Sequence, residues 1–164
     1  MKNIVLIGMM GCGKTTCANL LHQKLVRQVV DTDALIVERQ GRSISDIFAA
    51  EGEGYFRDLE TAVARELGDQ SDLIIATGGG LPLREENVAA LKPNGVVFWL
   101  KRDPADTFAS ESMEGRPLAQ EGQDAFVARF QQRSPLYQKA ADFVIQDFSS
   151  PERTVECILN CLKD

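Results

Sequence analysis

The sequence predicts an α/β fold built on a five-stranded parallel sheet with helices on both faces. Five short, mostly apolar runs are typical of strands that are covered on both sides. Segments with helical character separate these runs along the whole chain, and this alternation favours a parallel sheet in a three-layer arrangement. A length of 164 residues, with 44% hydrophobic and 26% charged residues, suits a single globular domain over residues 1–164.

The predicted strands differ mainly in how they end. NIVLIG is β-branched and leads into glycines, VVDTD closes on Asp31 and Asp33, and DLIIATGGG runs into three consecutive glycines. GVVFWL and DFVIQ complete the set. In chain order the predicted strand segments cover residues 3–8, 29–33, 72–80 (a strand together with the triple-glycine turn that ends it), 95–100 and 142–146.

The predicted helices are recognised by apolar spacing, capping residues and breaks. Residues 14–26 place Ala18 and Leu21 at helical spacing. The segment RDPADTF opens another helix, with Asp103 as its expected N-cap and Pro104 at the first helical position. Further helices are expected at residues 42–66, in two pieces broken near Gly52 and Gly54, at 85–92 with a stop at Pro93, at 124–137 and at 151–162.

Bulk composition excludes several classes of protein. A formal net charge of -6 argues against nucleic acid as a partner. The N-terminus lacks the features of a signal peptide, and no run approaches the roughly 20 apolar residues of a membrane span. The four cysteines include no C-x-x-C pair, so we expect thiols in a reducing compartment rather than a metal site. These observations predict a soluble, cytoplasmic protein.

The segment LIGMMGCGKTT matches the phosphate-loop pattern G-x-x-x-x-G-K-[ST], with Gly8, Gly13, Lys14 and Thr15 at the fixed positions. Its place between a buried strand and a helix is the context that this motif requires. Backbone N–H groups and the helix N-terminus would hold phosphate, Lys14 would reach the β- and γ-phosphates, and Thr15 would bind Mg²⁺. The predicted nucleotide-binding residues are Gly11, Cys12, Gly13, Lys14, Thr15 and Thr16.

Residues 111–123 are predicted to form a mobile lid. They lack apolar periodicity and contain Gly115, Pro117 and Gly122. Arg116 would close over the phosphates, where it would neutralise charge while the lid excluded water. The short chain and this arginine favour a small kinase over a GTPase or motor ATPase, although an exposed loop arginine would also explain Arg116.

The acceptor side is predicted from strand ends, because the carboxyl ends of parallel strands open onto one crevice. Asp31 would act on Mg²⁺, and Asp33 would accept a hydrogen bond from a substrate hydroxyl and help to remove its proton. Either aspartate, Asp33 in particular, could instead be the N-cap of the next helix. Three glycines, residues 78–80, would let backbone N–H groups approach a ligand closely.

Two arginines that lie beside apolar residues in the sequence are further candidates for substrate binding. Arg57 and Arg133 could converge on a carboxylate and bind it in bidentate fashion. Spacing alone favours surface salt bridges instead, since Glu60 follows Arg57 by three residues.

The chain resembles the shikimate kinase family over residues 2–162. The resemblance rests on six segments in the same order and spacing: GMMGCGKTT, VVDTD, GRSISDIFAAEGEGYFRDLE, ATGGG, GRPL and RSPLY. It implies a P-loop kinase fold of the nucleoside monophosphate kinase type, with a substrate-binding helical region at residues 33–60 and the lid at 111–123. It also implies ATP- and Mg²⁺-dependent phosphorylation of the 3-hydroxyl of shikimate, toward chorismate and the aromatic amino acids, by a monomer.

Residue by residue, the resemblance implies Asp33 as the base and Arg57 and Arg133 as the pair that binds the substrate carboxylate. The other implied roles fall to Gly79 and Gly80 beside the substrate ring, Arg116 at the transferred phosphate, Lys14 at the ATP phosphates, and Thr15 and Asp31 at the metal.

Three departures from the family pattern stand out. The segment DTFASES lacks the arginine that often lies near adenine, the lid is acidic where many relatives are basic, and Cys12 replaces a common serine. Two alternatives stay open. Another small-molecule kinase, acting on gluconate or a nucleoside monophosphate, would need a different acceptor pocket. A nucleotide-dependent binding protein would have no need of Lys14, Asp33 and Arg116 together.

Overall fold

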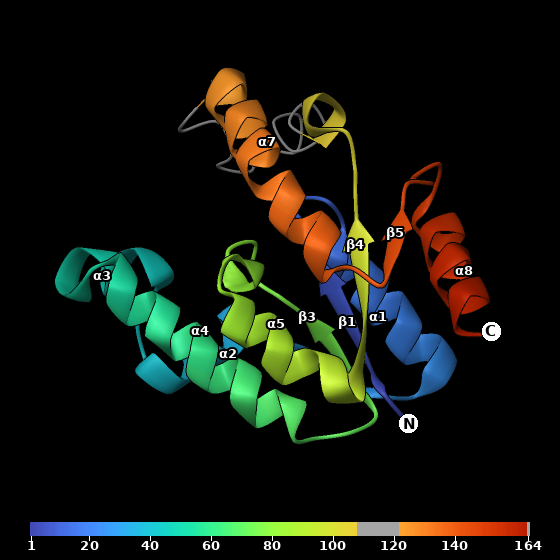
Figure 1. Ribbon diagram of the computed structural model, residues 1–164, viewed down its shortest axis with the longest axis horizontal. Helices are drawn as coiled ribbons and strands as arrows, with labels where there is room; N and C mark the ends of the chain where they lie inside the picture. The colour runs from blue at the N-terminus through green and yellow to red at the C-terminus, as the bar shows by residue number, and fades with distance from the viewer. Residues whose placement is uncertain (108–121, 164) are drawn as a thin grey trace.

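The computed structural model describes residues 1–107 and 122–163. Its sheet has five parallel strands in the order β2-β3-β1-β4-β5, which confirms the predicted fold class (Figure 1). The strands are β1 (Asn3–Ile7), β2 (Gln28–Asp31), β3 (Leu73–Ala76), β4 (Gly95–Leu100) and β5 (Phe143–Ile145).

Helices connect these strands in chain order. They are α1 (Lys14–Leu25), α2 (Thr32–Gln40), α3 (Ile44–Glu51), α4 (Glu53–Gly68), α5 (Glu85–Leu91), α7 (Gly122–Ala140) and α8 (Pro151–Leu162), with the short 3₁₀ turns η1 (Leu81–Leu83) and η2 (Lys92–Asn94). Residues 104–107 are also helical. The Asp103 Oδ1 atom accepts a hydrogen bond from the Ala105 N–H at 2.8 Å, which confirms the predicted cap.

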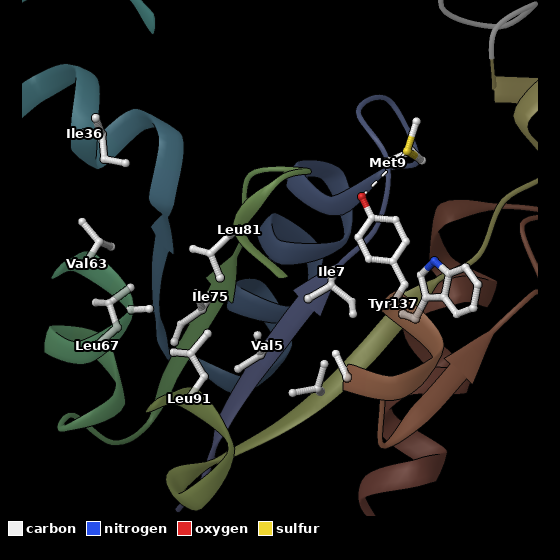
Figure 2. Packing of buried hydrophobic residues seen from close by; sticks show 14 of the residues in the cluster. Val5, Ile7, Met9, Ile36, Val63, Leu67, Ile75, Leu81, Leu91 and Tyr137 are labelled. Carbon is white, nitrogen blue, oxygen red and sulfur yellow. Dashed lines mark hydrogen bonds between the residues drawn. The ribbon is translucent and has the colours of Figure 1, made fainter. Parts of the chain in front are cut away.

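Alternate residues of the central strand β1 face two separate hydrophobic cores. Ile4 and Leu6 pack with buried residues of α1 and α8. Val5 and Ile7 pack with residues of α4, α5 and α7 on the opposite face, and Figure 2 shows these two side chains near Leu91 and Tyr137. Because both faces of the strand are covered, every residue of β1 is buried, as its nearly uniform apolar sequence predicts.

The structure corrects three of the predicted boundaries. The second strand ends at Asp31 rather than Asp33, and α2 begins at once because the Asp31 Oδ1 atom accepts a hydrogen bond from the Ala34 N–H at 3.0 Å. The break between α3 and α4 falls at Gly52, with φ of 87°, whereas Gly54 lies inside α4. The last sheet-covering helix before β5 begins at Gly122 and ends at Ala140, beyond the predicted 124–137.

The order of the strands places a crevice above β1. The helix that follows β1 packs on one face of the sheet, whereas the helices that follow its neighbours β3 and β4 pack on the other face. Where the following elements diverge in this way, the carboxyl ends of the strands are left open to a ligand. The glycine loop after β1 therefore lies in the middle of the crevice, with β2 and β3 on one side and β4 and β5 on the other.

Candidate active site

A cleft of about 730 Å³ opens at the carboxyl ends of the strands. It is lined by residues 9–17 of the glycine loop and α1, by Asp31 and Asp33, by Ile44, Phe48, Phe56, Arg57 and Glu60 of α3 and α4, by residues 77–80 after β3, by Arg102, Phe126, Arg129 and Arg133, and by Phe148, Ser150, Pro151 and Thr154. The described residues among the predicted site residues therefore all meet in one cavity.

The glycine loop has the backbone conformation that its sequence predicts. Gly13 is the N-cap of α1 and has φ of 103°, a left-handed value that favours glycine. Gly8 has φ of 147°, and a Cβ atom there would lie 2.9 Å from the Leu100 carbonyl oxygen. The loop thus begins in close contact with the end of β4 and delivers the N-terminus of α1 to the cleft.

Lys14 is held at the mouth of this loop. Its Nζ atom donates hydrogen bonds to the carbonyl oxygens of Gly8, at 2.5 Å, and Met9, at 2.9 Å. Its ammonium group also lies 3.8 Å from the Cys12 Sγ atom. The first turn of α1 thus presents a cation and the Thr15 hydroxyl to the same cavity.

Asp31 and Asp33 have different structural roles. Asp31, not Asp33, is the N-cap of α2, so the alternative that assigned the cap to Asp33 is wrong. Asp33 lies in the first turn of α2 and faces Gly78, where a Cβ atom would come within 2.3 Å of an Asp33 carboxylate oxygen. Burial, and then the charge of Asp31, raise the pKa of Asp33, while Lys14 and Arg57 partly oppose this shift. A half-buried carboxyl of this kind is suited to accept a proton.

The two segments that carry this carboxyl and the glycines are tied together. The Gly78 N–H donates to the Thr32 hydroxyl oxygen at 2.8 Å, and the Thr77 hydroxyl donates to the Leu6 carbonyl at 2.9 Å. Both threonines are buried. The turn after β3 is therefore fixed to β1 and α2, which holds the backbone of residues 78–80 against the cleft.

Arg57 forms the ion pair that its spacing predicts, but the pair is not on the surface. Its Nη1 atom lies 2.7 Å from the Glu60 Oε1 atom, and the side chains are 15% and 1% exposed, respectively. The guanidinium also lies 5.5 Å from the centre of the Phe56 ring. Burial raises the pKa of Glu60 although Arg57 lowers it. Surface pairing therefore does not explain Arg57, which is fixed at the edge of the cleft.

Arg133 approaches the same region from α7. A Cβ atom on Gly79 would lie 3.1 Å from its Nη1 atom, and one on Gly80 would lie 2.1 Å from the Nη1 atom of Arg57. The two guanidinium groups thus lie beside consecutive glycines. Glycine at positions 79 and 80 leaves room for both guanidinium groups. The two arginines and the two glycines therefore form one arrangement.

Tyr137, like Glu60, belongs to the site although the sequence analysis assigned it no role there. The Tyr137 hydroxyl donates to the Gly79 carbonyl at 2.6 Å and lies 3.7 Å from the Met9 sulfur, toward which it points in Figure 2. Tyr137 is fully buried, and burial raises its pKa to about 12, so it stays a neutral donor. The motif RSPLY places Tyr137 one helical turn after Arg133. This spacing indicates that the two side chains share a helix face, but it does not indicate which residue Tyr137 contacts.

Two predictions reach beyond the described residues. Arg116 and the lid interval 111–121 lie outside them. Gly122 and Gln123, the last two residues of the predicted lid, belong to α7. Within residues 1–107 and 122–163, no three His, Cys, Asp or Glu side chains are grouped to hold a metal ion, and no helix is both long and apolar enough to cross a bilayer.

Comparison with known proteins identifies the family. The sequence model described as shikimate kinase matches residues 10–163. The chain is 40% identical to the shikimate kinase of Burkholderia lata, over 88% of this chain and 80% of that protein. It is 37% identical to the shikimate kinase of Sulfurihydrogenibium sp., over 99% of both chains.

The fold comparison agrees with the sequence comparison. The structure of shikimate kinase from Acinetobacter baumannii in complex with shikimate superposes with a TM-score of 0.89 and 33% sequence identity, covering 99% of this chain and 93% of that one. The glycine loop, the half-buried Arg57 and the glycines after β3 therefore lie in a chain that belongs to the shikimate kinase family.

Proposed function

We propose that this protein transfers the γ-phosphoryl group of ATP to the 3-hydroxyl of shikimate, with Mg²⁺. One observation carries the proposal: a carboxyl with a raised pKa, Asp33, lines the same cleft as a phosphate loop and a pair of arginines. Phosphoryl transfer needs a bound polyphosphate, an oriented hydroxyl and little else from the protein. A cleft that combines a phosphate loop, a carboxyl and two arginines supports transfer to a hydroxylated carboxylate.

The donor side would be formed by Gly11, Cys12, Gly13, Lys14, Thr15 and Thr16. Backbone N–H groups at the start of α1 would hold the phosphates, and Lys14 would exchange its loop carbonyls for phosphate oxygens. Mg²⁺ suits the donors at this point, because it typically takes one or two protein oxygens together with substrate phosphates. Thr15 and Asp31 would hold it, and the ion would neutralise charge on the transferred group.

The acceptor side would be formed by Arg57, Arg133, Gly79 and Gly80. Two guanidinium groups would bind the carboxylate of shikimate, since bidentate pairing gives both affinity and orientation. The backbone of the two glycines would contact the ring, which a side chain at either position would displace. Asp33 would then accept the proton of the hydroxyl that attacks the γ-phosphorus.

Arg116 and the lid would complete the site. We propose that Arg116 meets the transferred phosphate and that residues 111–123 cover the cleft, as the family resemblance implies. We further propose that the protein acts as a cytoplasmic monomer with a small-molecule acceptor, and with neither nucleic acid nor a membrane as partner.

The experiment that tests the proposal is a coupled ADP-release assay with ATP and Mg²⁺. Shikimate, gluconate and a panel of nucleoside monophosphates would be compared as acceptors. We expect turnover with shikimate alone. Turnover with gluconate or a nucleotide instead would leave the assignment of the phosphate loop intact and would overturn the assignment of the acceptor. ATP binding without turnover on any acceptor would favour a binding protein and overturn the kinase assignment.

Replacing Gly80 with alanine should raise the KM for shikimate about tenfold with little effect on kcat. The backbone at Gly80 has φ of -93°, which alanine adopts without strain, so the effect comes from the new methyl group. That group would lie 2.1 Å from the Arg57 Nη1 atom and would push the guanidinium away. Steady-state kinetics would measure the change.

Gly54→Ala is the matched control for this substitution. Gly54 lies within α4, and a Cβ atom there would have no neighbour within 4 Å. The control should keep the wild-type KM and gain about 0.5–1 kcal/mol of stability from helix propensity. An unchanged KM in Gly80→Ala would show that Arg57 does not hold the acceptor.

A further inference from the structure

One buried hydroxyl group joins three elements of the candidate site. Tyr137 lies on α7, and its hydroxyl donates the hydrogen bond of 2.6 Å to the Gly79 carbonyl oxygen. The same hydroxyl lies 3.7 Å from the sulfur of Met9, in the glycine loop (Figure 2). Helix α7, the turn after β3 and the glycine loop therefore meet at this hydroxyl. Tyr137 is fully buried and does not itself line the cleft.

The Tyr137 hydroxyl also lies beside the guanidinium group of Arg133. The two residues are four positions apart on α7, so their side chains project from one face of the helix. Burial raises the pKa of Tyr137 to about 12, while the charge of Arg133 and a side-chain hydrogen bond with it oppose this shift. A neutral hydroxyl donates one hydrogen bond and still accepts another. Tyr137 can therefore hold the Gly79 carbonyl and the Arg133 guanidinium at the same time.

The bond to the Gly79 carbonyl fixes a whole peptide group. The peptide between Gly79 and Gly80 is planar and trans, so its carbonyl and its N–H point in opposite directions. With the carbonyl held by Tyr137, the Gly80 N–H points away from Tyr137. Gly80 is buried and lines the cleft, and its N–H has no acceptor in residues 1–107 and 122–163. Since buried N–H groups are almost always paired, this donor is left for a ligand in the cleft.

Two cations border the same peptide group. A Cβ atom on Gly79 would lie 3.1 Å from the Arg133 Nη1 atom, and one on Gly80 would clash with the Arg57 guanidinium. The Gly80 N–H and the two guanidinium groups therefore face one part of the cleft. Donors of this kind bind a carboxylate strongly only when their directions agree, because each hydrogen bond weakens when it is misaligned.

We propose that Tyr137 is a positioning residue for the acceptor: its hydroxyl orients the Gly79–Gly80 peptide and the Arg133 guanidinium so that both donate to one carboxylate. Because Tyr137 does not line the cleft, it acts through these two groups and not by contact with the substrate. The inference rests on the proposed function, since the carboxylate is that of shikimate. It gives the last residue of the motif RSPLY a role that is distinct from that of its arginine.

The test compares wild type with Tyr137→Phe by isothermal titration calorimetry and steady-state kinetics. Phenylalanine keeps the ring, whose centre lies 5.7 Å from that of Trp99, and removes only the hydroxyl. We expect the Kd and the KM of shikimate to rise about tenfold, because the Gly79 carbonyl loses its partner and the donors lose their alignment. The kcat and the Kd of ATP should change by less than about twofold, since other atoms hold the phosphates.

An acceptor analogue without a carboxylate separates positioning from a general loss of packing. In the hydroxymethyl analogue of shikimate the carboxylate is reduced to an alcohol, so the aligned donors have no anion to bind. Its inhibition constant as a competitor of shikimate should be the same, within about twofold, in wild type and in Tyr137→Phe. An equal loss of affinity for shikimate and for the analogue would indicate a distorted cleft and would overturn the inference.

Tyr55→Phe is the matched control. The Tyr55 hydroxyl also donates a hydrogen bond, to the Gln40 Oε1 atom at 3.2 Å, but Tyr55 is exposed and does not line the cleft. Its substitution should leave the Kd and the KM of shikimate unchanged.

Two further results would count against the inference, and they can be told apart. An unchanged Kd of shikimate in Tyr137→Phe would remove Tyr137 from acceptor binding and leave the proposed function intact. A wild-type protein that binds ATP but neither binds nor phosphorylates shikimate would overturn the proposed function and the inference together.

Discussion

Replacing Asp33 with asparagine should lower kcat about 10³-fold while changing the Kd of ATP by less than about twofold. Asparagine keeps the shape of the side chain but cannot accept the proton of the attacking hydroxyl. The glycine loop and Lys14 hold the donor through other atoms, so ATP binding should persist. Steady-state kinetics and calorimetry on the same preparation would measure both quantities.

The pH dependence of the wild type should report the same carboxyl. Because burial and the charge of Asp31 raise the pKa of Asp33, the acid limb of kcat/KM should lie above the value of about 3.9 for an ordinary aspartate. Activity should fall as the pH decreases through this raised pKa, since the base becomes protonated. In Asp33→Asn the residual activity should lose this limb.

The stability of the variant provides an independent check. A carboxyl whose pKa is higher in the folded than in the unfolded state binds its proton more tightly when folded, so it lowers stability as the pH rises through that interval. At neutral pH the ionised Asp33 is therefore unfavourable for folding, and Asp33→Asn should keep or raise Tm.

Asp46→Asn is the matched control for the Asp33 variant. Asp46 also lies in the first turn of its helix, α3, but it is exposed and does not line the cleft. It should keep the wild-type kcat. A wild-type kcat in Asp33→Asn would contradict the assignment of the base.

The parts of the fold that could be predicted are those with local causes. The glycine loop depends on conformations that glycine adopts at fixed spacing, so the motif alone located it. The last helix, Pro151–Leu162, was predicted to the residue, and it begins with a serine cap and a proline in its first turn. The strands β1, β3 and β4 were recognised because burial on both faces leaves a continuous apolar run.

The errors arose where tertiary contacts decide the local structure. VVDTD has the composition of a strand end, but the sheet register pairs Asp31 with Ala76 and stops there, and the Asp31 cap turns the chain into α2. The spacing of Arg57 and Glu60 predicted their pairing, whereas the burial of the pair depends on how α4 packs. The bond from Tyr137 to Gly79 joins residues 58 positions apart, and no local pattern encodes such a contact.

Replacing Arg57 with methionine should raise the KM for shikimate about 100-fold and lower the free energy of unfolding by about 3 kcal/mol. The first effect comes from the loss of a charged hydrogen bond to the acceptor. The loss of stability comes from Glu60, because its buried carboxylate would lose its ion-pair partner, the Arg57 Nη1 atom at 2.7 Å. The Glu60 Oε2 atom already has no hydrogen bond among the described residues. Kinetics and urea unfolding would measure the two effects separately.

A second substitution separates the two roles of Arg57. In Arg57→Met/Glu60→Gln the buried side chain is neutral, so most of the lost stability should return, whereas the KM should stay high because the guanidinium is still absent. The stability deficit of the single variant should also depend on pH. Because burial raises the pKa of Glu60, the unpaired carboxyl takes up a proton more readily in the folded state, and the deficit should shrink as the pH falls through that raised pKa.

Arg65→Met is the control on the same helix. Arg65 pairs with Glu86 at 3.2 Å, but both side chains are well exposed, so its loss should cost less than about 1 kcal/mol and leave the KM unchanged. If the double variant were as unstable as Arg57→Met, the lost stability would come from the contact of the guanidinium with the Phe56 ring rather than from an unpaired charge. Recovery of stability without recovery of KM would instead show that Glu60 accompanies Arg57 because a buried carboxylate fixes the guanidinium where the acceptor needs it.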